Sequence, residues 1–236
     1  MAYKKRKDDY TIVEPQHSTS FTVSPYGQYA TIQRPAPTSF VEIRDIIAAL
    51  LVLTVAFSWI IYVPDGKGFL YYIGSAAVIV VAGFFVHEMS HKIAARRYGC
   101  WAEFRADYRG LGLVLVTAFF GFLFAAPGAV WIRGNVTRNQ NGKISLAGPG
   151  SNIAVSVACV ALLITSAVGT SGTLYDIAYR LLYFNAFLAA FNMIPVMPFD
   201  GSKIWQWNKP IYIAALVAAG LLFYLGYTGL SGHAAL

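Results

Sequence analysis

The feature that most constrains this chain is a run of nineteen residues, Gly68 to Val86, that contains no charged side chain. A hydrocarbon layer about 30 Å thick is crossed by about 20 apolar residues of helix, so this run has the length of a membrane-spanning helix. The whole chain agrees, because 57% of its 236 residues are apolar and only 12% are charged. A mean hydropathy of +0.54 does not suit a soluble domain. We therefore expect a polytopic membrane protein.

The apolar run is followed directly by the sequence His-Glu-Met-Ser-His, residues 87–91. Two histidines four residues apart project from one face of a helix, so both imidazoles can bind a single zinc ion. Glu88 lies beside them and can take a proton from a zinc-activated water molecule. Ionisable side chains in membrane helices are costly and usually functional, which favours a site over a polar helix end. The pattern predicts metal-assisted hydrolysis, with His87 and His91 as ligands and Glu88 as general base.

A hydrolytic zinc site needs a third protein ligand and an open position for water. Downstream of the motif the acidic residues and histidines are few: Glu103, Asp107, Asp176, Asp200 and His233. Glu103 and Asp107 lie close to two arginines, where solvated salt pairs are the simpler interpretation. Asp176 follows a turn-forming segment and suits the N-terminus of a helix, where a negative charge is stabilised.

Asp200 is the strongest candidate for the third ligand. It follows Pro195 and Pro198, which unwind the end of an apolar helix, and irregular backbone at membrane depth is tolerated mainly where it lines a cavity. Gly201 then allows a tight turn. We predict Asp200 as the third ligand, and a metallopeptidase that uses Glu103 instead stays open as an alternative.

Apolar stretches of spanning length occur at six places. They are residues 46–63, 68–86, 110–132, 144–169, 181–199 and 210–230. If His87 and Asp200 share one zinc ion, both lie near the same membrane face, so an even number of crossings separates them. We therefore predict that 110–132 does not cross, and that Pro127 and Gly128 belong to a membrane-associated re-entrant or β-hairpin segment. The predicted fold is an all-α polytopic membrane protein with about five full transmembrane helices and this additional segment.

The basic residues give an independent test of this topology. With five crossings and the N-terminus inside, sixteen of the eighteen Lys and Arg residues lie on the cytoplasmic side, in agreement with the positive-inside rule. The net charge of +7 is thereby explained by membrane topology, and we expect no nucleic-acid partner.

The chain is expected to have two parts. Residues 1–38 lack helical periodicity and are predicted to form a flexible cytoplasmic tail, with short strands as the alternative. Residues 39–236 are predicted to form a single membrane-embedded metalloprotease domain. Ser39, followed three residues later by Glu42, resembles a capping box and marks the start of the first helix.

Two further motifs extend the pattern: Ala147-Gly148-Pro149 with Asn152, and the segment from Asn192 to Gly201. Together with the histidine motif they resemble the site-2 protease family of intramembrane zinc metalloproteases, over residues 68–202. The resemblance implies that His87, His91 and Asp200 hold one zinc ion and that Glu88 is the general base. It also implies that Asn192 binds the substrate backbone or the developing oxyanion. Asn152 is a second candidate for substrate binding, although an amide in the first turn of a membrane helix also suits hydrogen bonding between helices, which we favour.

The expected function is hydrolysis of a peptide bond in or near a transmembrane segment of a membrane protein substrate, close to the cytoplasmic face. The expected location is a multi-pass position in a prokaryotic cell membrane, with the N-terminus and the active site towards the cytoplasm. The main alternative is a non-catalytic membrane scaffold or binding protein with a structural zinc ion, which a fourth ligand such as His233 would favour. A zinc carrier is a weaker alternative, because no histidine occurs between His91 and His233.

Overall fold

The computed structural model describes residues 20–23, 29–32, 38–122, 127–167 and 169–233. Contacts divide the chain into two units, 1–37 and 38–236. The first unit contains two paired antiparallel strands, β1 (Ser20–Val23) and β2 (Tyr29–Ile32). Most of the tail predicted for residues 1–38 lies outside the described residues.

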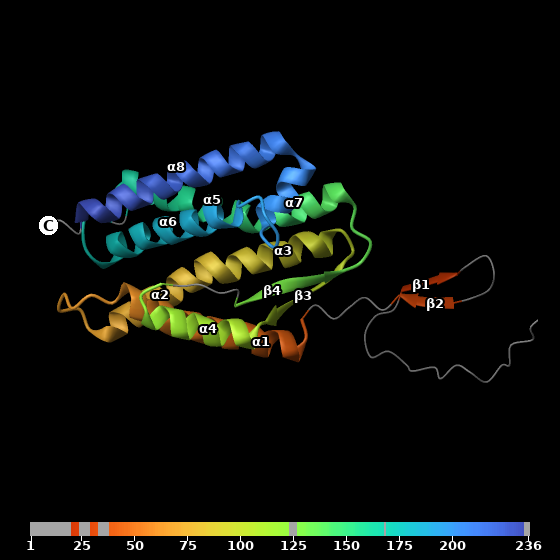
Figure 1. Cartoon of the computed structure of the whole chain (residues 1–236), viewed down its shortest axis with the longest axis horizontal. Helices are drawn as coiled ribbons and strands as arrows, with labels where there is room; N and C mark the ends of the chain where they lie inside the picture. The colour runs from red at the N-terminus through yellow and green to blue at the C-terminus, as the bar shows by residue number, and fades with distance from the viewer. Residues whose placement is uncertain (1–19, 24–28, 33–37, 123–126, 168, 234–236) are drawn as a thin grey trace, which may run out of the picture. The chain divides into compact units, whose positions relative to one another are not determined.

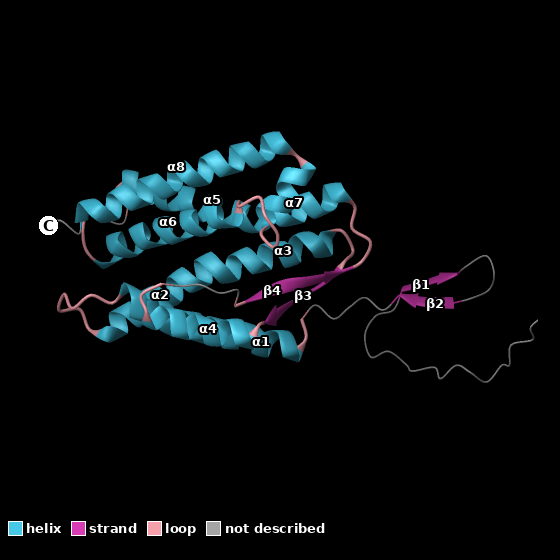
Figure 2. Ribbon diagram, in the orientation of Figure 1, coloured by secondary structure: helices cyan, strands magenta, loops and turns pink. Residues whose placement is uncertain are grey.

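The second unit is mostly helical, as Figure 2 shows, with one further pair of strands. Its elements in chain order are α1 (Phe40–Ile61), α2 (Phe69–Val80), the π-helical turn η1 (Val81–Phe85), α3 (Val86–Arg97), β3 (Trp101–Ala106), α4 (Tyr108–Phe119), β4 (Gly128–Arg133), α5 (Arg138–Ile164), α6 (Thr173–Asn192), α7 (Asp200–Trp207) and α8 (Lys209–His233). Of these, α2, η1 and α3 follow one another without a break and form a single rod of 29 residues.

Helix α3 lies between two groups of elements (Figure 1). On one side it packs against α5, which in turn contacts α6 and α7, while α6 contacts α8. On the other side it contacts β3 and β4, and α1 packs against β3, α2 and α4. Small side chains are fully buried in these helices, among them Ala49, Ala76, Ala186 and Ala189, and such residues let helix backbones approach closely. The histidine motif therefore occupies the most central helix of the unit.

Three helical segments of the described chain combine the length and the apolar composition needed to cross a membrane. They are Phe69–Arg97, Arg138–Ile164 and Lys209–Gly229. Helices α1 and α6, which correspond to the other two predicted crossings, contain 22 and 20 residues. At a rise of 1.5 Å per residue both reach about 30 Å. The total of five crossings stays a prediction.

The segment 110–132 was predicted as a re-entrant or β-hairpin segment, and the structure corrects its form. Helix α4 fills its first part, because the Asp107 side chain accepts hydrogen bonds from the N–H groups of Arg109 and Gly110 and so caps the helix. With 12 residues, α4 is about 18 Å long and too short to cross a bilayer alone. The second part contains β4, whose antiparallel partner β3 lies before the predicted segment. An apolar run of this kind does not distinguish helix from strand by periodicity.

The N-terminus of α1 differs in one detail from the predicted capping box. Ser39 caps the helix as expected, since its Oγ accepts a hydrogen bond from the Glu42 N–H. The Glu42 carboxylate does not complete the box. It turns away from the helix end to contact Lys92 on α3 and the backbone of β3.

Candidate metal centre

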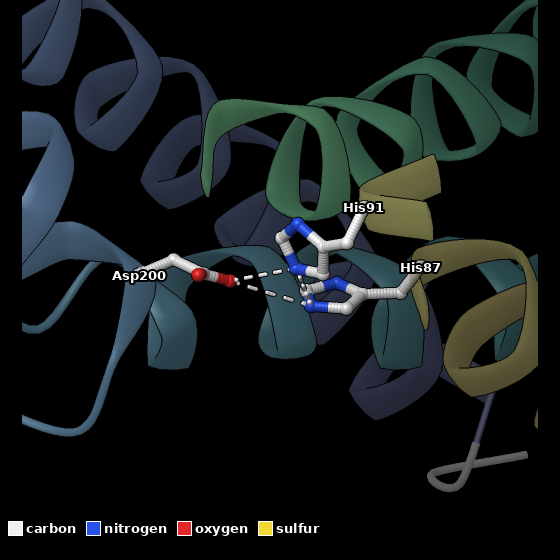
Figure 3. A group of neighbouring side chains, drawn as sticks. All are labelled: His87, His91 and Asp200. Carbon is white, nitrogen blue, oxygen red and sulfur yellow. Dashed lines mark hydrogen bonds and ion pairs between the residues drawn. The ribbon is translucent and has the colours of Figure 1, made fainter. Parts of the chain in front are cut away.

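Two histidines and one aspartate converge in the second unit (Figure 3). His87 and His91 lie one turn apart on α3, and Asp200 is the first residue of α7. The two Nε2 atoms are 3.0 Å apart, and the Asp200 Oδ2 atom lies 3.0 Å from that of His91 and 3.5 Å from that of His87. All three residues are at most 8% exposed. The structure thus brings together the three ligands predicted from the sequence.

These separations fit a zinc ion. A tetrahedral zinc ion with bonds of about 2.0–2.1 Å places its ligand atoms about 3.3 Å apart, close to the three distances found here. Gly148 on α5 keeps the adjacent space open, because a Cβ atom there would lie 2.3 Å from the Nε2 of His91 and 2.6 Å from that of His87. No fourth His, Cys, Asp or Glu joins the group in the part of the chain that the structure describes.

The outer ring nitrogens of both histidines are held by acceptors on α5. His87 Nδ1 lies 2.6 Å from Oδ1 of Asn152, and His91 Nδ1 lies 2.7 Å from the carbonyl oxygen of Ile144. A carbonyl oxygen can only accept, so His91 donates from Nδ1, and its Nε2 carries a lone pair when the ring is neutral. Contacts of this kind fix the tautomer and the orientation of metal-binding histidines.

Asn152 is oriented by its own contacts. Its Nδ2 donates to the carbonyl oxygen of Gly83 at 3.0 Å and to Oδ1 of Asn185 at 2.9 Å, so its Oδ1 faces His87 as an acceptor. Asn185 in turn donates to the carbonyl oxygen of Leu181. Asn152 and Asn185 are fully buried. The side chain of Asn152 is therefore used inside the protein, which favours the role between helices over substrate binding.

Asp200 reaches the histidines through the turn that precedes α7. The helix unwinds before Asp200, as the two prolines predicted: α6 ends at Asn192, and residues 193–199 form turns and bends. Gly201 is required for the close approach of α7 to this turn, since a Cβ atom there would lie 2.3 Å from the carbonyl oxygen of Met193. The Asp200 Oδ2 faces both imidazoles. Lys203 lies 3.6 Å from its other oxygen, Oδ1.

Together these groups require a positive charge between them. The ionised Asp200 and the inward ring nitrogens of His87 and His91 all present lone pairs to one small, buried space when the rings are neutral. Lone pairs at 3.0–3.5 Å repel one another unless a proton or a metal cation lies among them. Two nitrogens and one carboxylate oxygen are ligands that zinc accepts.

Glu88 lies on the neighbouring stripe of α3 and faces the strand pair. Its Oε2 accepts a hydrogen bond of 3.1 Å from the backbone N–H of Val130 in β4. A carboxylate held by one donor keeps its remaining lone pairs for other protons. This arrangement is compatible with the predicted role of general base.

The remaining candidates have other contacts. The Asn192 Nδ2 donates to the carbonyl oxygen of Leu188 within α6, so its predicted contact with substrate stays a prediction. Glu103 accepts a hydrogen bond from Ser39 and pairs with Arg105, which does not support it as a zinc ligand. The side chain of His233 lies outside the described residues.

Sequence reasoning missed several residues that support the centre. Gly83, Asn185 and Ile144 contribute through backbone or amide groups, and nothing in an apolar sequence distinguishes these positions. Lys92 is one of the sixteen basic residues expected on the cytoplasmic side, and the structure buries it beside the motif. The only available signal was its position four residues after Glu88, which places both on one face of a helix.

Known proteins supply a relative that covers most of the chain. The chain is 39% identical over 188 residues to a Methanocaldococcus jannaschii protein named "Putative zinc metalloprotease MJ0611", and the match covers 79% of this chain and 93% of that protein. The chain belongs to this zinc metalloprotease family.

A second relative has a similar name but a longer chain. The Mycobacterium tuberculosis protein named "Putative zinc metalloprotease Rip3" is 29% identical over 137 residues, which are 56% of this chain and 31% of that protein. Comparisons with family models and with solved structures found no match. Family membership supports zinc as the ion suited to the three converging donors.

Proposed function

We propose that this protein is an intramembrane zinc metalloendopeptidase of the site-2 protease type, which cuts a membrane protein substrate in or near a transmembrane segment. The observation that carries the proposal is the convergence of His87, His91 and Asp200 at distances that suit one zinc ion. These histidines lie on a rod of 29 residues that is long and apolar enough to cross a membrane. The zinc metalloprotease family supports the hydrolytic chemistry.

The reaction uses groups that the chain already positions. A zinc ion held by His87, His91 and Asp200 would supply Lewis acidity and lower the pKa of a water molecule towards neutrality. Glu88 takes the proton from the attacking water and returns it to the leaving amine. Asn192 donates an amide N–H to the oxyanion that develops on the scissile carbonyl, which requires its side chain to release the Leu188 carbonyl oxygen.

The substrate is proposed to be a locally unwound transmembrane segment. A helix hides its carbonyl groups in hydrogen bonds, so cleavage requires an extended stretch of backbone. Among the described residues β4 pairs with β3 alone, and its other edge, where the Val130 N–H contacts Glu88, can add an extended peptide as a further strand beside the general base. The lipid bilayer is proposed as the second partner, and the distribution of the basic residues supports a site towards the cytoplasmic face of a cell membrane.

The described site favours catalysis over a structural zinc ion. Structural zinc sites are closed by four protein ligands, whereas catalytic sites keep a position open. The group contains three ligands among the described side chains, which leaves room for water. We therefore prefer the peptidase to the zinc-containing scaffold.

The decisive experiment compares two substitutions in the purified, detergent-solubilised protein. Glu88→Gln should retain one zinc ion per chain and lose cleavage of a model transmembrane substrate by at least about a hundredfold, because a general base contributes 10²–10⁴-fold. Asp200→Ala should lose both zinc and cleavage. Glu103→Gln is the control, and should keep both. Full cleavage in Glu88→Gln, or unchanged zinc in Asp200→Ala, would refute the proposal.

A further inference from the structure

A buried ion pair lies next to the catalytic motif and has no part in the chemistry described so far. The Lys92 ammonium is 2.6 and 2.7 Å from the two carboxylate oxygens of Glu42. Glu42 is fully buried and Lys92 is 6% exposed. Two buried charges are costly to remove from water and are retained mainly where their geometry matters.

The pair belongs to the same stripe of α3 as the general base. His87 and His91 are four residues apart and point towards Asp200 and α5 (Figure 3). Glu88 and Lys92 are also four residues apart, so they share the adjacent face of the helix. That face contacts the strand pair. The stripe with His87 and His91 thus faces the candidate metal site, and the stripe with Glu88 and Lys92 contacts the strand pair and α1.

The contacts of Glu42 cross the strand pair to Glu88. Glu42 Oε1 accepts a hydrogen bond of 3.0 Å from the N–H of Phe104 in β3. Phe104 is directly opposite Val130 in β4, and the Val130 N–H donates to Glu88. In an antiparallel pair, two opposing residues whose N–H groups both point outward do not bond to each other. The Phe104 N–H therefore binds the Glu42 carboxylate at the outer edge of β3, and the Val130 N–H binds the Glu88 carboxylate at the outer edge of β4.

The result is a closed ring of contacts. It runs from Glu88 through β4, β3 and Glu42 to Lys92, and returns along one turn of α3 to Glu88. Asp45 adds a second contact of the same kind, because its Oδ2 accepts a hydrogen bond of 3.3 Å from the Ala106 N–H. The outer edge of β3 is thereby fixed to the first turns of α1 by two carboxylates.

We propose that Glu42, whose charge Lys92 neutralises, is a positioning residue for the general base. Glu42 fixes the position of the strand pair along α3. The Val130 N–H then sets the direction in which the Glu88 carboxylate points. This proposal rests on the proposed peptidase function for its catalytic consequence. Its structural consequence, the fixing of β4, does not depend on activity.

The test replaces the pair without leaving a buried charge. In Glu42→Met/Lys92→Met neither charge remains, and the acceptor for the Phe104 N–H is lost. In Glu42→Gln/Lys92→Met the charges are also absent, but the glutamine oxygen can still accept that hydrogen bond. Leu53→Ala is a control for simple destabilisation, because Leu53 is a buried core residue of the same helix. The measurements are kcat at saturating model substrate, zinc per chain, melting temperature, and hydrogen exchange of peptides that cover 128–133.

We expect Glu42→Met/Lys92→Met to keep about one zinc ion, to lose at least about tenfold in kcat, and to exchange faster in β4. The glutamine variant should stay within about threefold of wild type in kcat. Leu53→Ala should lower the melting temperature without changing kcat or exchange in β4. Unchanged exchange and kcat in the double methionine variant would overturn the proposal, as would loss of zinc together with kcat, or equal loss in the glutamine variant. If the wild type cleaves no substrate, the peptidase function fails, and the exchange measurement still decides whether Glu42 fixes β4.

Discussion

One methyl group tests the metal centre most directly. Gly148 lies on α5 where the two imidazoles approach its backbone, and alanine at this position would place its Cβ atom 2.3 Å from the Nε2 of His91. Ordinary contact begins at 3.4 Å, so the ring or the helix must retreat by about 1.1 Å. Metal–ligand distances tolerate only about ±0.2 Å. The substitution should therefore break the coordination geometry.

The expected size of the effect follows from this displacement. Changes to the partners of metal ligands alone weaken affinity about 10–100-fold, and here both ligands are displaced directly. We expect Gly148→Ala to weaken zinc binding by at least about a hundredfold, which is about 2.8 kcal/mol. The intrinsic effect on the helix has the opposite sign, because alanine in place of glycine stabilises a helix interior by roughly 0.5–1 kcal/mol.

Gly150→Ala is the matched control. It lies two residues further along α5, and nothing lies within 4 Å of a Cβ atom built there. Both variants gain the same helix propensity, so only the contact with the imidazoles separates them. Zinc per chain should be measured after dialysis against a graded series of a competing chelator. Equal zinc affinity in Gly148→Ala and Gly150→Ala would refute the assignment of the site.

The other predictions address the partners of the site. Asn152→Ala should weaken zinc about 10–100-fold in the same chelator competition, because His87 Nδ1 loses its acceptor; unchanged affinity would remove Asn152 from the site. Val130→Pro deletes the N–H that donates to Glu88 without deleting a bond between the strands, so kcat should fall at least about tenfold with zinc retained. Lys203→Met should weaken zinc by a few-fold only, since Lys203 is partly exposed, and a larger loss would show a stronger role in orienting Asp200. Chelation should lower the melting temperature, and added zinc should restore it, since an ion at 100 times its Kd stabilises by about 2.7 kcal/mol.

The metal ligands could be predicted because their chemistry leaves few choices. Two histidines four apart on a membrane helix need a third ligand, and few acidic residues follow them in the chain. Asp200 was therefore identified largely by elimination. The supporting contacts could not be predicted in the same way, because one buried amide in an apolar helix looks like another. The contact between Asn152 and His87 depends on how α5 packs against α3, which the sequence does not show.

The elements around the site were harder to predict than the ligands. The run 110–132 is apolar throughout most of its length, so its sequence allowed helix, strand or re-entrant loop. The outcome depended on Asp107, which caps α4, and on the pairing of β4 with a strand from before the run. The contact between Glu42 and Lys92 could not be predicted for a different reason. Charges near a membrane interface usually face water, and only the folded chain shows that these two meet in its interior.

The π-helical turn η1 lies in the middle of the central rod. It joins α2, which packs against α1, to α3, which carries the ligands. A π-helical turn contains about one residue more than an α-helical turn, so a deletion of one residue within Val81–Phe85 would restore regular α-helix and leave the orientation of α2 relative to His87 nearly unchanged. A deletion of Gly74 within α2 would instead rotate Tyr72 by about 100° relative to His87 and turn this fully buried side chain away from its present neighbours. Two deletions in the same uncharged stretch, with similarly mild effects on hydropathy, should therefore differ widely in the damage they cause.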